Sequence, residues 1–164
     1  MPDLALFEPD IPQNTGAILR LAACFGAPVR VIDPAGFDLS DRRLRRAGMD
    51  YLDLVELTRH RDWPAFEAWR QGNGRRLVAL TSHGEQLLPD FAFRSDDVLL
   101  FGRESSGLPV EALEAAGARL RIPIRSEARS LNLATAAAIA LYEALRQTAR
   151  LPSARPSDGL GGGP

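Results

Sequence analysis

Short apolar runs alternate with amphipathic stretches along most of the chain. The runs are almost wholly hydrophobic, which is typical of parallel strands covered on both faces. The stretches between them carry apolar residues at helical spacing. The pattern predicts strands at residues 4–7, 29–32, 52–57, 77–81, 98–101 and 120–122. It predicts helices at residues 15–25, 41–47, 64–71, 109–116 and 131–150.

This alternation predicts an α/β fold with a mostly parallel sheet and helices on both faces. No repeat or internal linker interrupts residues 1–150, so we expect them to form a single domain. Residues 151–164 contain three prolines and four glycines and lack the apolar content to pack. We expect this tail to be disordered.

Composition narrows the class of protein. The chain has 164 residues, and its 45% of hydrophobic residues is enough for a normal core. No apolar run approaches the roughly 18 residues of a membrane span, and the first residues lack the pattern of a signal peptide. We therefore expect a cytoplasmic protein without membrane association. The single cysteine, Cys24, lies on an apolar helical stretch, where core filling is the expected role rather than reactivity.

Charge excludes a globally basic nucleic-acid binder, because the formal net charge is −1. All 20 basic residues are arginine, so any phosphate held by a cationic side chain meets a planar guanidinium. The strongest local basic patch is Arg42, Arg43, Arg45 and Arg46, which helical spacing turns outward while Leu44 points inward. A solvated helix face and an RNA-binding surface both explain this patch.

Polar segments follow four of the predicted strands, at residues 8–16, 81–84, 102–107 and 123–130. In parallel α/β sheets, ligands bind beyond the carboxyl ends of the strands. We therefore expect these segments to form one site. The sequence shows no spacing typical of a metal site and no Ser/His/Asp or Cys/His set of a hydrolase.

The first of these segments continues into Asn14-Thr-Gly-Ala-Ile-Leu-Arg20. Asn14 or Thr15 can cap the predicted helix, and Gly16 permits a close approach. Arg20 follows Gly16 by one turn on the same face, where it can meet a phosphate at the helix N-terminus. An ordinary capped helix with one solvated arginine explains the same spacing.

Two later segments carry further candidates. In Phe101-Gly-Arg-Glu-Ser-Ser-Gly-Leu-Pro109, Gly102 directly after a strand lets a ligand touch the backbone, and the pattern is neither a dinucleotide fingerprint nor a P-loop. Glu104 is either a free surface carboxylate or the partner of a nearby arginine. In the loop at 122–132, Ser130 and Asn132 are both good helix caps. The alanine-rich helix after them permits close packing, against the sheet or against another subunit.

In order and content, these segments resemble the motifs of the SPOUT RNA methyltransferases. Further matching stretches are Leu6-Phe-Glu-Pro-Asp-Ile-Pro-Gln-Asn-Thr-Gly16, Arg42-Arg-Leu-Arg-Arg-Ala-Gly48 and Thr58-Arg-His60. The resemblance covers residues 3–150 and is nearest to the small single-domain type that methylates the wobble nucleotide of tRNA. It implies S-adenosylmethionine as methyl donor without a metal, tRNA as substrate, a homodimer and a C-terminal trefoil knot.

The resemblance also assigns roles to residues. It implies a donor pocket lined by Leu80, Gly102, Ile122, Ser130 and Leu131. It implies Arg20, Glu104 and Asn132 as catalytic residues, and an RNA-binding surface of Asn14, Arg42, Arg43, Arg45 and Arg46. Three other readings stay open: a 2′-O-methyltransferase of another RNA, a cofactor-binding domain of another enzyme type, and an RNA-binding module without catalysis.

Overall fold

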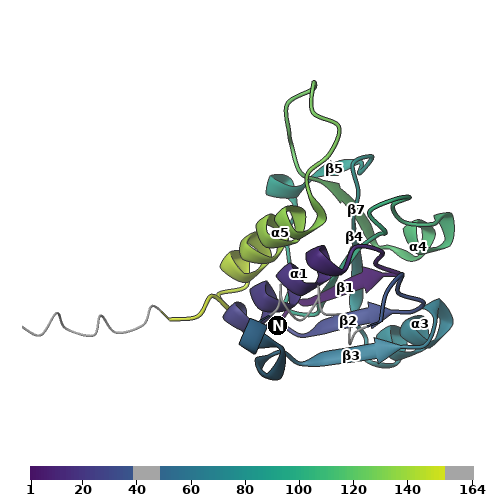
Figure 1. Ribbon diagram of the computed structural model, residues 1–164. Coiled ribbons are helices and arrows are strands. Elements are labelled where there is room, and N and C mark those ends of the chain that lie inside the picture. The colour runs from purple at the N-terminus through teal and green to yellow at the C-terminus, as the bar shows by residue number, and fades with distance from the viewer. Residues whose placement is uncertain (39–48, 154–164) are drawn as a thin grey trace, which may run out of the picture.

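A seven-stranded parallel sheet forms the centre of the molecule (Figure 1). The computed structural model describes residues 1–38 and 49–153. The strands are β1 (Asp3–Phe7), β2 (Val29–Ile32), β3 (Leu57–His60), β4 (Arg76–Leu80), β5 (Gln86–Leu87), β6 (Asp97–Phe101) and β7 (Ala118–Arg121). Their order across the sheet is β3-β2-β1-β6-β4-β7-β5, and every pairing is parallel. The predicted α/β class with a mostly parallel sheet is confirmed.

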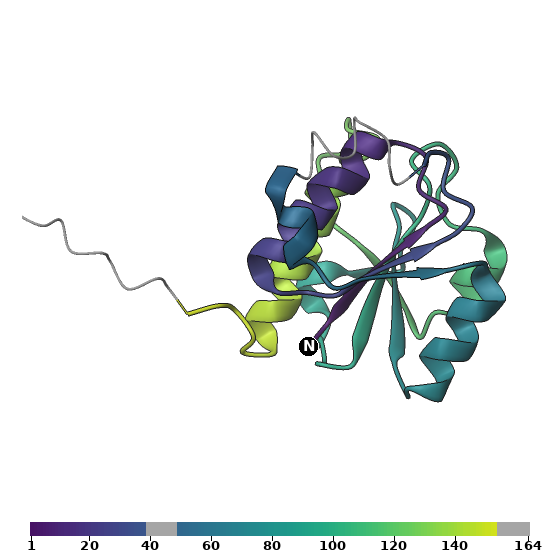
Figure 2. The ribbon, with the colours of Figure 1, turned by 60° about the horizontal axis from the view of Figure 1, so that its bottom comes forward.

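Helices cover both faces of this sheet (Figure 2). The helices are α1 (Pro12–Phe25), α3 (Trp63–Gly72), α4 (Val110–Ala115) and α5 (Leu133–Gln147), with 3-10 turns η1 (Met49–Leu54) and η2 (Leu88–Asp90). Helices α1 and α5 lie on one face, and α3 and α4 lie on the other. None of the helices within residues 1–38 and 49–153 is long and apolar enough to span a membrane.

The continuous apolar strands fill two cores at once. In β1, Leu4 and Leu6 belong to the core under α1 and α5, whereas Ala5 and Phe7 belong to the core under α3 and α4. This division follows from the two-residue period of a strand, which turns successive side chains to opposite faces. A strand buried on both faces has few positions open to polar side chains, which explains why the runs read as unbroken hydrophobic segments.

One predicted strand is wrong. The pattern predicts a strand at residues 52–57, but the 3-10 turn η1 occupies Met49–Leu54 and β3 starts only at Leu57. The pairing of β3 with β2 sets this register, with Leu57 opposite Val29. The alternating apolar residues therefore fall on a turn, where Leu54 is 68% exposed. The helix expected at 41–47 lies outside the described residues, as does the tail after residue 153.

The connection from β4 to β5 forms an arch over the end of β7. Leu80 at the end of β4 and Gln86 at the start of β5 both stand opposite Leu120 of β7, on its two sides. The residues between them must therefore cross the carboxyl end of β7. The backbone N–H of Thr81 donates to the carbonyl of Leu120 at 2.9 Å, and a Cβ on Gly84 would lie 2.3 Å from the carbonyl carbon of Leu120. Backbone packs directly on backbone here, an approach that only glycine permits.

Buried carboxylates anchor the opposite, amino edge of the sheet. Asp97 is fully buried and accepts from Nε and Nη2 of Arg76 at 2.6 and 2.8 Å. Asp3 is paired with both Arg30 and Arg75. Burial raises the pKa of Asp3, and the charges of the two arginines oppose that shift. Paired in this way, charged groups can remain at the edge of a sheet whose strands are otherwise largely apolar.

His60, at the end of β3, is buried among aromatic rings. It is 8% exposed and lies 5.4 Å from the ring centroids of both Phe66 and Trp69. Its Nε2 has no hydrogen-bond partner among the described residues. Burial, and then the charge of Arg30, lower the pKa of this imidazole. The folded protein therefore favours the neutral ring.

We expect His60 to make stability depend on pH. Because the pKa is lower in the folded state, the unfolded chain binds a proton first, so stability is complete above the unfolded value of about 6.5 and declines as pH falls through the folded value. Each pH unit between the two pKa values removes at most about 1.4 kcal/mol. Denaturant unfolding of wild type and His60→Phe between pH 7.5 and 5 measures this, because the difference between the two curves isolates His60 from the carboxylates. Parallel curves would contradict the assignment.

Candidate functional site

Loops at the carboxyl ends of β1 and β6 meet and are fastened together by side chains. Asp10 and Glu104 bond each other reciprocally: the backbone N–H of Asp10 donates to Oε2 of Glu104 at 3.0 Å, and the backbone N–H of Glu104 donates to Oδ1 of Asp10 at 3.2 Å. The hydroxyl of Ser105 also bonds the carboxylate of Asp10. Strand pairing places these loops side by side, since Leu6 of β1 stands opposite Phe101 of β6.

A chain of hydrogen bonds continues from Glu104 to helix α5. Asn14 donates from Nδ2 to Oε1 of Glu104 at 3.0 Å, and Asn132 donates from Nδ2 to Oδ1 of Asn14 at 2.8 Å. Oδ1 of Asn132 in turn accepts from the backbone N–H groups of Ala134 and Thr135, which makes Asn132 the N-cap of α5. Segments 90 and 118 residues apart are joined in this way. The structure therefore brings together Asn14, Glu104 and Asn132, three of the predicted site residues.

The two carboxyl groups at the centre of this network have opposite pKa shifts. Hydrogen bonding with Glu104 lowers the pKa of Asp10 to about 2; burial opposes this shift, and the hydrogen bonds with Ser105 add to it. Burial, followed by the side-chain hydrogen bond with Asp10, raises the pKa of Glu104. Asp10 is thus the carboxylate that stays charged, and Glu104 the one that takes up a proton more readily. Divergent pKa values in neighbouring acids are typical of functional sites.

Helix α1 starts earlier than expected, and this changes the role of its polar residues. The helix begins at Pro12, its N-cap is Ile11, and no side chain caps it. The expected capping by Asn14 or Thr15 is therefore wrong. Proline is suited to the first helical turn because it has no N–H to leave unpaired. Asn14 is released from capping and bonds Glu104 and Asn132 instead.

Arg20 lies two turns into α1, so the expected position one turn from the N-terminus is also wrong. Its side chain is exposed, and its guanidinium lies 5.0 Å from the ring centroid of Tyr51 in η1. Arg20 follows Asn14 by six residues, about 9 Å along the axis and on a different face of the helix. The helix therefore presents the two residues at different places on the surface.

The predicted donor residues gather at the ends of β4, β6 and β7. Leu80 stands between Phe101 and Leu120 in the sheet, so Gly102 and Ile122 follow directly on its two sides. Leu80 is 9% exposed, Ile122 and Leu131 are half-buried, and Ser130 is exposed in the loop before α5. Figure 1 shows this loop projecting beyond β5. Of the two expected caps, Asn132 performs the role and Ser130 does not.

Close packing against the protein's own backbone is one reason for a glycine at position 102. A Cβ at this position would lie 2.3 Å from the carbonyl carbon of Gly107 and 2.5 Å from the nitrogen of Leu108. The nearest contact of such a Cβ is therefore with the protein's own backbone. Residues 103–107 form a tight loop, closed by two backbone hydrogen bonds between Arg103 and Gly107, and this loop sits on Gly102.

Several residues of the site do not stand out in the sequence. Asp10, Ser105 and the arch glycine Gly84 each make contacts that join distant segments. Asp10 lies within the matched stretch after the first strand, but its spacing gives no separate signal. The arginines at 42, 43, 45 and 46 lie outside the described residues. Among the residues that are described, no three His, Cys, Asp or Glu side chains are placed to hold a metal ion.

Comparison with known proteins identifies the family. The profile described as the SpoU rRNA Methylase family matches residues 2–142, and the chain belongs to this family. The resemblance to RNA methyltransferases in the sequence is confirmed.

Individual relatives are similar in sequence or structure over nearly the whole chain. A tRNA (cytidine(34)-2'-O)-methyltransferase of Beijerinckia indica is 56% identical over 148 residues, which cover 90% of this chain and 92% of that protein. The solved structure described as "Structural insights into the 2-OH methylation of C/U34 on tRNA" has a TM-score of 0.86 at 46% identity, covering 90% of this chain and 95% of that one. An AdoMet-bound rRNA methyltransferase from Sinorhizobium meliloti has a TM-score of 0.83 at 34% identity, covering 88% of this chain and 56% of that one.

The contact at Gly102 predicts a loss of stability on substitution. Gly102→Ala forces a methyl group into the backbone of residues 107–108, and we expect it to lower the free energy of unfolding by about 2–3 kcal/mol. Gly72→Ala is the matched control at the end of α3, because a Cβ there would meet no neighbouring atom within 4 Å beyond its own helix, and alanine favours a helix by about 0.5–1 kcal/mol. Thermal unfolding of both variants measures the contrast. A Gly102→Ala protein as stable as wild type would show that the loop relaxes freely.

Two substitutions at Asn132 separate capping from the link to Asn14. Asn132→Ala removes both, and we expect a loss of about 1 kcal/mol in the free energy of unfolding. Asn132→Asp still accepts from the helix N–H groups, so it should keep the cap and near-wild-type stability while losing the donor to Asn14. The side-chain amide signals of Asn14 in a ¹H–¹⁵N spectrum should move in both variants. Equal destabilisation by the two would mean that the link to Asn14, and not the cap, holds the helix.

Proposed function

We propose that this protein is an S-adenosylmethionine-dependent tRNA methyltransferase acting on the ribose 2′-hydroxyl of nucleotide 34, cytidine or uridine. The observation that carries the proposal is the agreement between the relatives and the site. Proteins that match over nine-tenths of the chain are named for this reaction, and the predicted residues Asn14, Glu104 and Asn132 meet in one network. A cytoplasmic location fits a tRNA substrate.

The residues at the ends of β4, β6 and β7 fit the proposed donor. S-adenosylmethionine carries an adenine ring, for which Leu80, Ile122 and Leu131 offer apolar contacts, and Ser130 offers a hydroxyl at the edge. Backbone groups at the strand ends can pair with the edge of the base. Gly102 contributes by letting the 103–107 loop fold back tightly, which fixes the wall beside this region. When bound, the donor supplies an activated methyl group.

The chain's own residues have the task of orienting the acceptor and receiving its proton. Alignment of the 2′-oxygen at about 3 Å from the methyl carbon supplies much of the acceleration in such a transfer. Asn14 and Asn132 are held by bonds to each other and to Glu104, so their remaining hydrogen-bonding groups have fixed directions. Glu104, whose pKa is raised by burial, is suited to exchange a proton within the network.

Arg20 is proposed to bind the phosphate beside the acceptor ribose. An arginine remains protonated at neutral pH, so it is a poor general base, whereas its positive charge favours ionisation of a nearby hydroxyl. The side chain is exposed on α1 and held over Tyr51, which restricts its rotation. The arginines at 42, 43, 45 and 46 are proposed from the sequence to extend the same RNA-binding surface.

The chain is also proposed to form the trefoil knot of the family. The arch from Leu80 to Gln86 crosses the end of β7, from which the chain continues to α5, and the proposed knot has this later segment pass through the arch. Helix α5 is tied back to the segment after the arch, since Gln147 accepts from the backbone N–H of Phe93 and donates to the carbonyl of Phe91. A loop closed around a later segment is the arrangement that a knot requires. An experimental structure with unbroken density from residue 81 to 133 would test the crossing.

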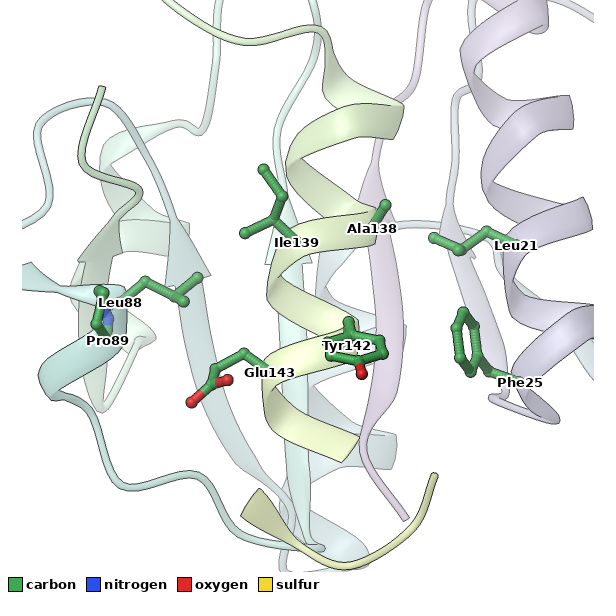
Figure 3. Close-up of a pocket in the computed structure, with 8 residues that line it drawn as sticks. All are labelled: Leu21, Phe25, Leu88, Pro89, Ala138, Ile139, Tyr142 and Glu143. Atoms are coloured by element: carbon green, nitrogen blue, oxygen red, sulfur yellow. The ribbon is translucent and has the colours of Figure 1, made fainter. Parts of the chain in front are cut away.

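A homodimer is proposed from a shallow apolar groove that runs over α5 and is flanked by α1 on one side and η2 on the other. The groove has a volume of about 620 Å³ and is lined by Leu21, Phe25, Leu88, Pro89, Ala138, Ile139, Tyr142 and Glu143 (Figure 3). Ile139 and Tyr142 are 39% and 50% exposed, which is unusual for large apolar side chains placed side by side on one helix. A second copy would cover this face and bring two RNA-binding surfaces together, which suits a protein of net charge −1.

The proposed substrate predicts a specific modification. Incubation with labelled S-adenosylmethionine and tRNA should place one methyl group on the 2′-oxygen of nucleotide 34. A tRNA carrying 2′-deoxycytidine at that position should bind with similar affinity and accept none. In the same assay, Arg20→Ala should lose turnover far more than donor affinity. Nucleoside mapping that finds the methyl group on a base, or in ribosomal RNA instead of tRNA, would contradict the proposal.

The proposed dimer predicts the effect of charge in the groove. Tyr142→Glu places a carboxylate at an exposed position, so the stability of the monomer itself should change little. The substitution should shift the protein from dimer to monomer at micromolar concentration. Arg150→Glu, just after the end of α5 and outside the groove lining, is the control. Sedimentation velocity distinguishes the two states. A wild-type protein that sediments as a monomer while active would contradict the dimer.

A further inference from the structure

Arg103 and Glu8 form an ion pair beside the network. Nη1 of Arg103 lies 3.0 Å from Oε2 of Glu8, and the two side chains are 36% and 23% exposed. Arg103 is the first residue of the tight loop after β6, directly before Glu104. Its backbone is fixed on both sides, by the hydrogen bonds to Gly107 and by the close packing of Gly102. The backbone that carries the guanidinium is therefore held rigidly at the edge of the candidate site.

The partner of this arginine has an unusual backbone conformation. Glu8 has a φ of +42°, a region that residues with a side chain rarely adopt. Its backbone N–H continues the sheet by donating to the carbonyl of Ile32 at 2.9 Å, so the unusual φ is held by the end of the β1–β2 pairing. Strain of this kind tends to occur where a side chain must be aimed for function. Here the side chain aimed by the strained backbone is the carboxylate that orients Arg103.

The guanidinium of Arg103 is only partly satisfied. Nη1 donates to Glu8 and Nη2 has no acceptor among the described residues, whereas Nε is buried, out of reach of a ligand. These contacts leave donors for an anionic oxygen, and a fork of this shape matches a phosphate. By comparison, Arg59 at the end of β3 directs both Nε and Nη2 to the carboxylate of Asp33, at 2.9 and 2.7 Å. Of these two arginines at the carboxyl edge, Arg103 has the spare capacity.

The order of strands separates Arg103 from the proposed donor region. Apart from Gly102 at the end of β6 itself, the donor residues follow β4 and β7, on one side of β6, and Arg103 reaches to Glu8 after β1, on the other side. The same side carries Asp10 and Glu104, two acids that would repel an RNA backbone. A substrate that carries a negative charge at every nucleotide needs a cation to approach these carboxylates. Arg103 is in place to supply it.

We propose that Arg103, oriented by Glu8, binds a phosphate of the RNA substrate next to the nucleotide that is methylated. The inference rests on the proposed function, because it takes RNA as the ligand. It adds a substrate-binding residue to the predicted ones and places it on the β1 side of the site. The RNA backbone would then pass on the β1 side of β6 while the donor occupies the side of β4 and β7.

The test compares substitutions at the two ends of β6. Arg103→Gln removes the charge, and Arg103→Lys keeps a charge without the planar fork. Arg94→Gln is the matched control, since Arg94 is exposed near the amino end of the same strand, on the far edge of the sheet. Binding is measured on an anticodon stem-loop with 2′-deoxycytidine at position 34, across a series of salt concentrations, and S-adenosylmethionine affinity is measured by calorimetry.

We expect Arg103→Gln to weaken RNA binding about tenfold and to reduce the salt dependence by about one counterion. The RNA affinity of Arg103→Lys should lie between those of Arg103→Gln and wild type, and the RNA affinity of Arg94→Gln should equal that of wild type. Donor affinity should be unchanged in all three. A purely structural ion pair would lower thermal stability without moving the salt dependence.

Three results would overturn the role of Arg103. One is a loss of donor affinity with unchanged RNA binding, which would place the guanidinium on the donor's carboxylate. A second is equal RNA binding by Arg103→Gln and wild type. The third is an equal loss in the Lys and Gln variants, which would show that charge is not what matters. If the wild-type protein binds no tRNA stem-loop, the proposed function itself fails, and this outcome is distinct from the other three.

Discussion

Direct packing of backbone against backbone at two glycines determines the shape of the carboxyl edge. At Gly102 the loop of residues 103–107 folds onto the end of β6, and at Gly84 the arch from β4 to β5 rests on the end of β7. In both places the atoms nearest to a Cβ, if one were present, would be backbone atoms between 2.3 and 2.6 Å away, so no side chain can be accommodated by a rotamer change. The loops that carry Glu104 and the proposed donor residues are positioned by these contacts.

Within this rigid edge, the hydrogen-bond network determines the protonation of Asp10 and Glu104. Asp10 is surrounded by donors and keeps its charge, whereas Glu104 is half-buried and holds a proton more easily. Because the two acids also bond each other's backbone, their separation is fixed and one cannot move without the other. The chain from Glu104 through Asn14 to Asn132 then transmits that position to the start of α5. A pair of surface acids without these bonds would titrate alike and hold nothing in place.

Much of the fold could be predicted from the sequence, because strands buried on both faces appear as unbroken apolar runs such as Val98–Phe101. The convergence of the polar segments could be predicted too, since carboxyl ends of parallel strands share an edge. Hydrogen bonds between side chains far apart in the sequence could not be predicted. The bond between Asp10 and Glu104 spans 94 residues, and no spacing rule reaches that far. Local rules also gave wrong predictions where tertiary contacts outweighed them. Asn14 is spaced like a helix cap, but its side chain bonds Glu104 instead. The alternation at residues 52–57 is typical of a strand, but most of this segment forms a turn.

The N-cap of α5 determines when, during synthesis of the chain, the hydrogen-bond network can be completed. Asn132 completes the network only when α5 has formed, because the helix N–H groups of Ala134 and Thr135 fix its side chain. A helix of this kind needs most of its length before it is stable against the sheet. A nascent chain that has already built β1 to β7 therefore still lacks the bond between Asn132 and Asn14. The chain of hydrogen bonds from Glu104 to α5 is therefore complete only after the final helix has been synthesised.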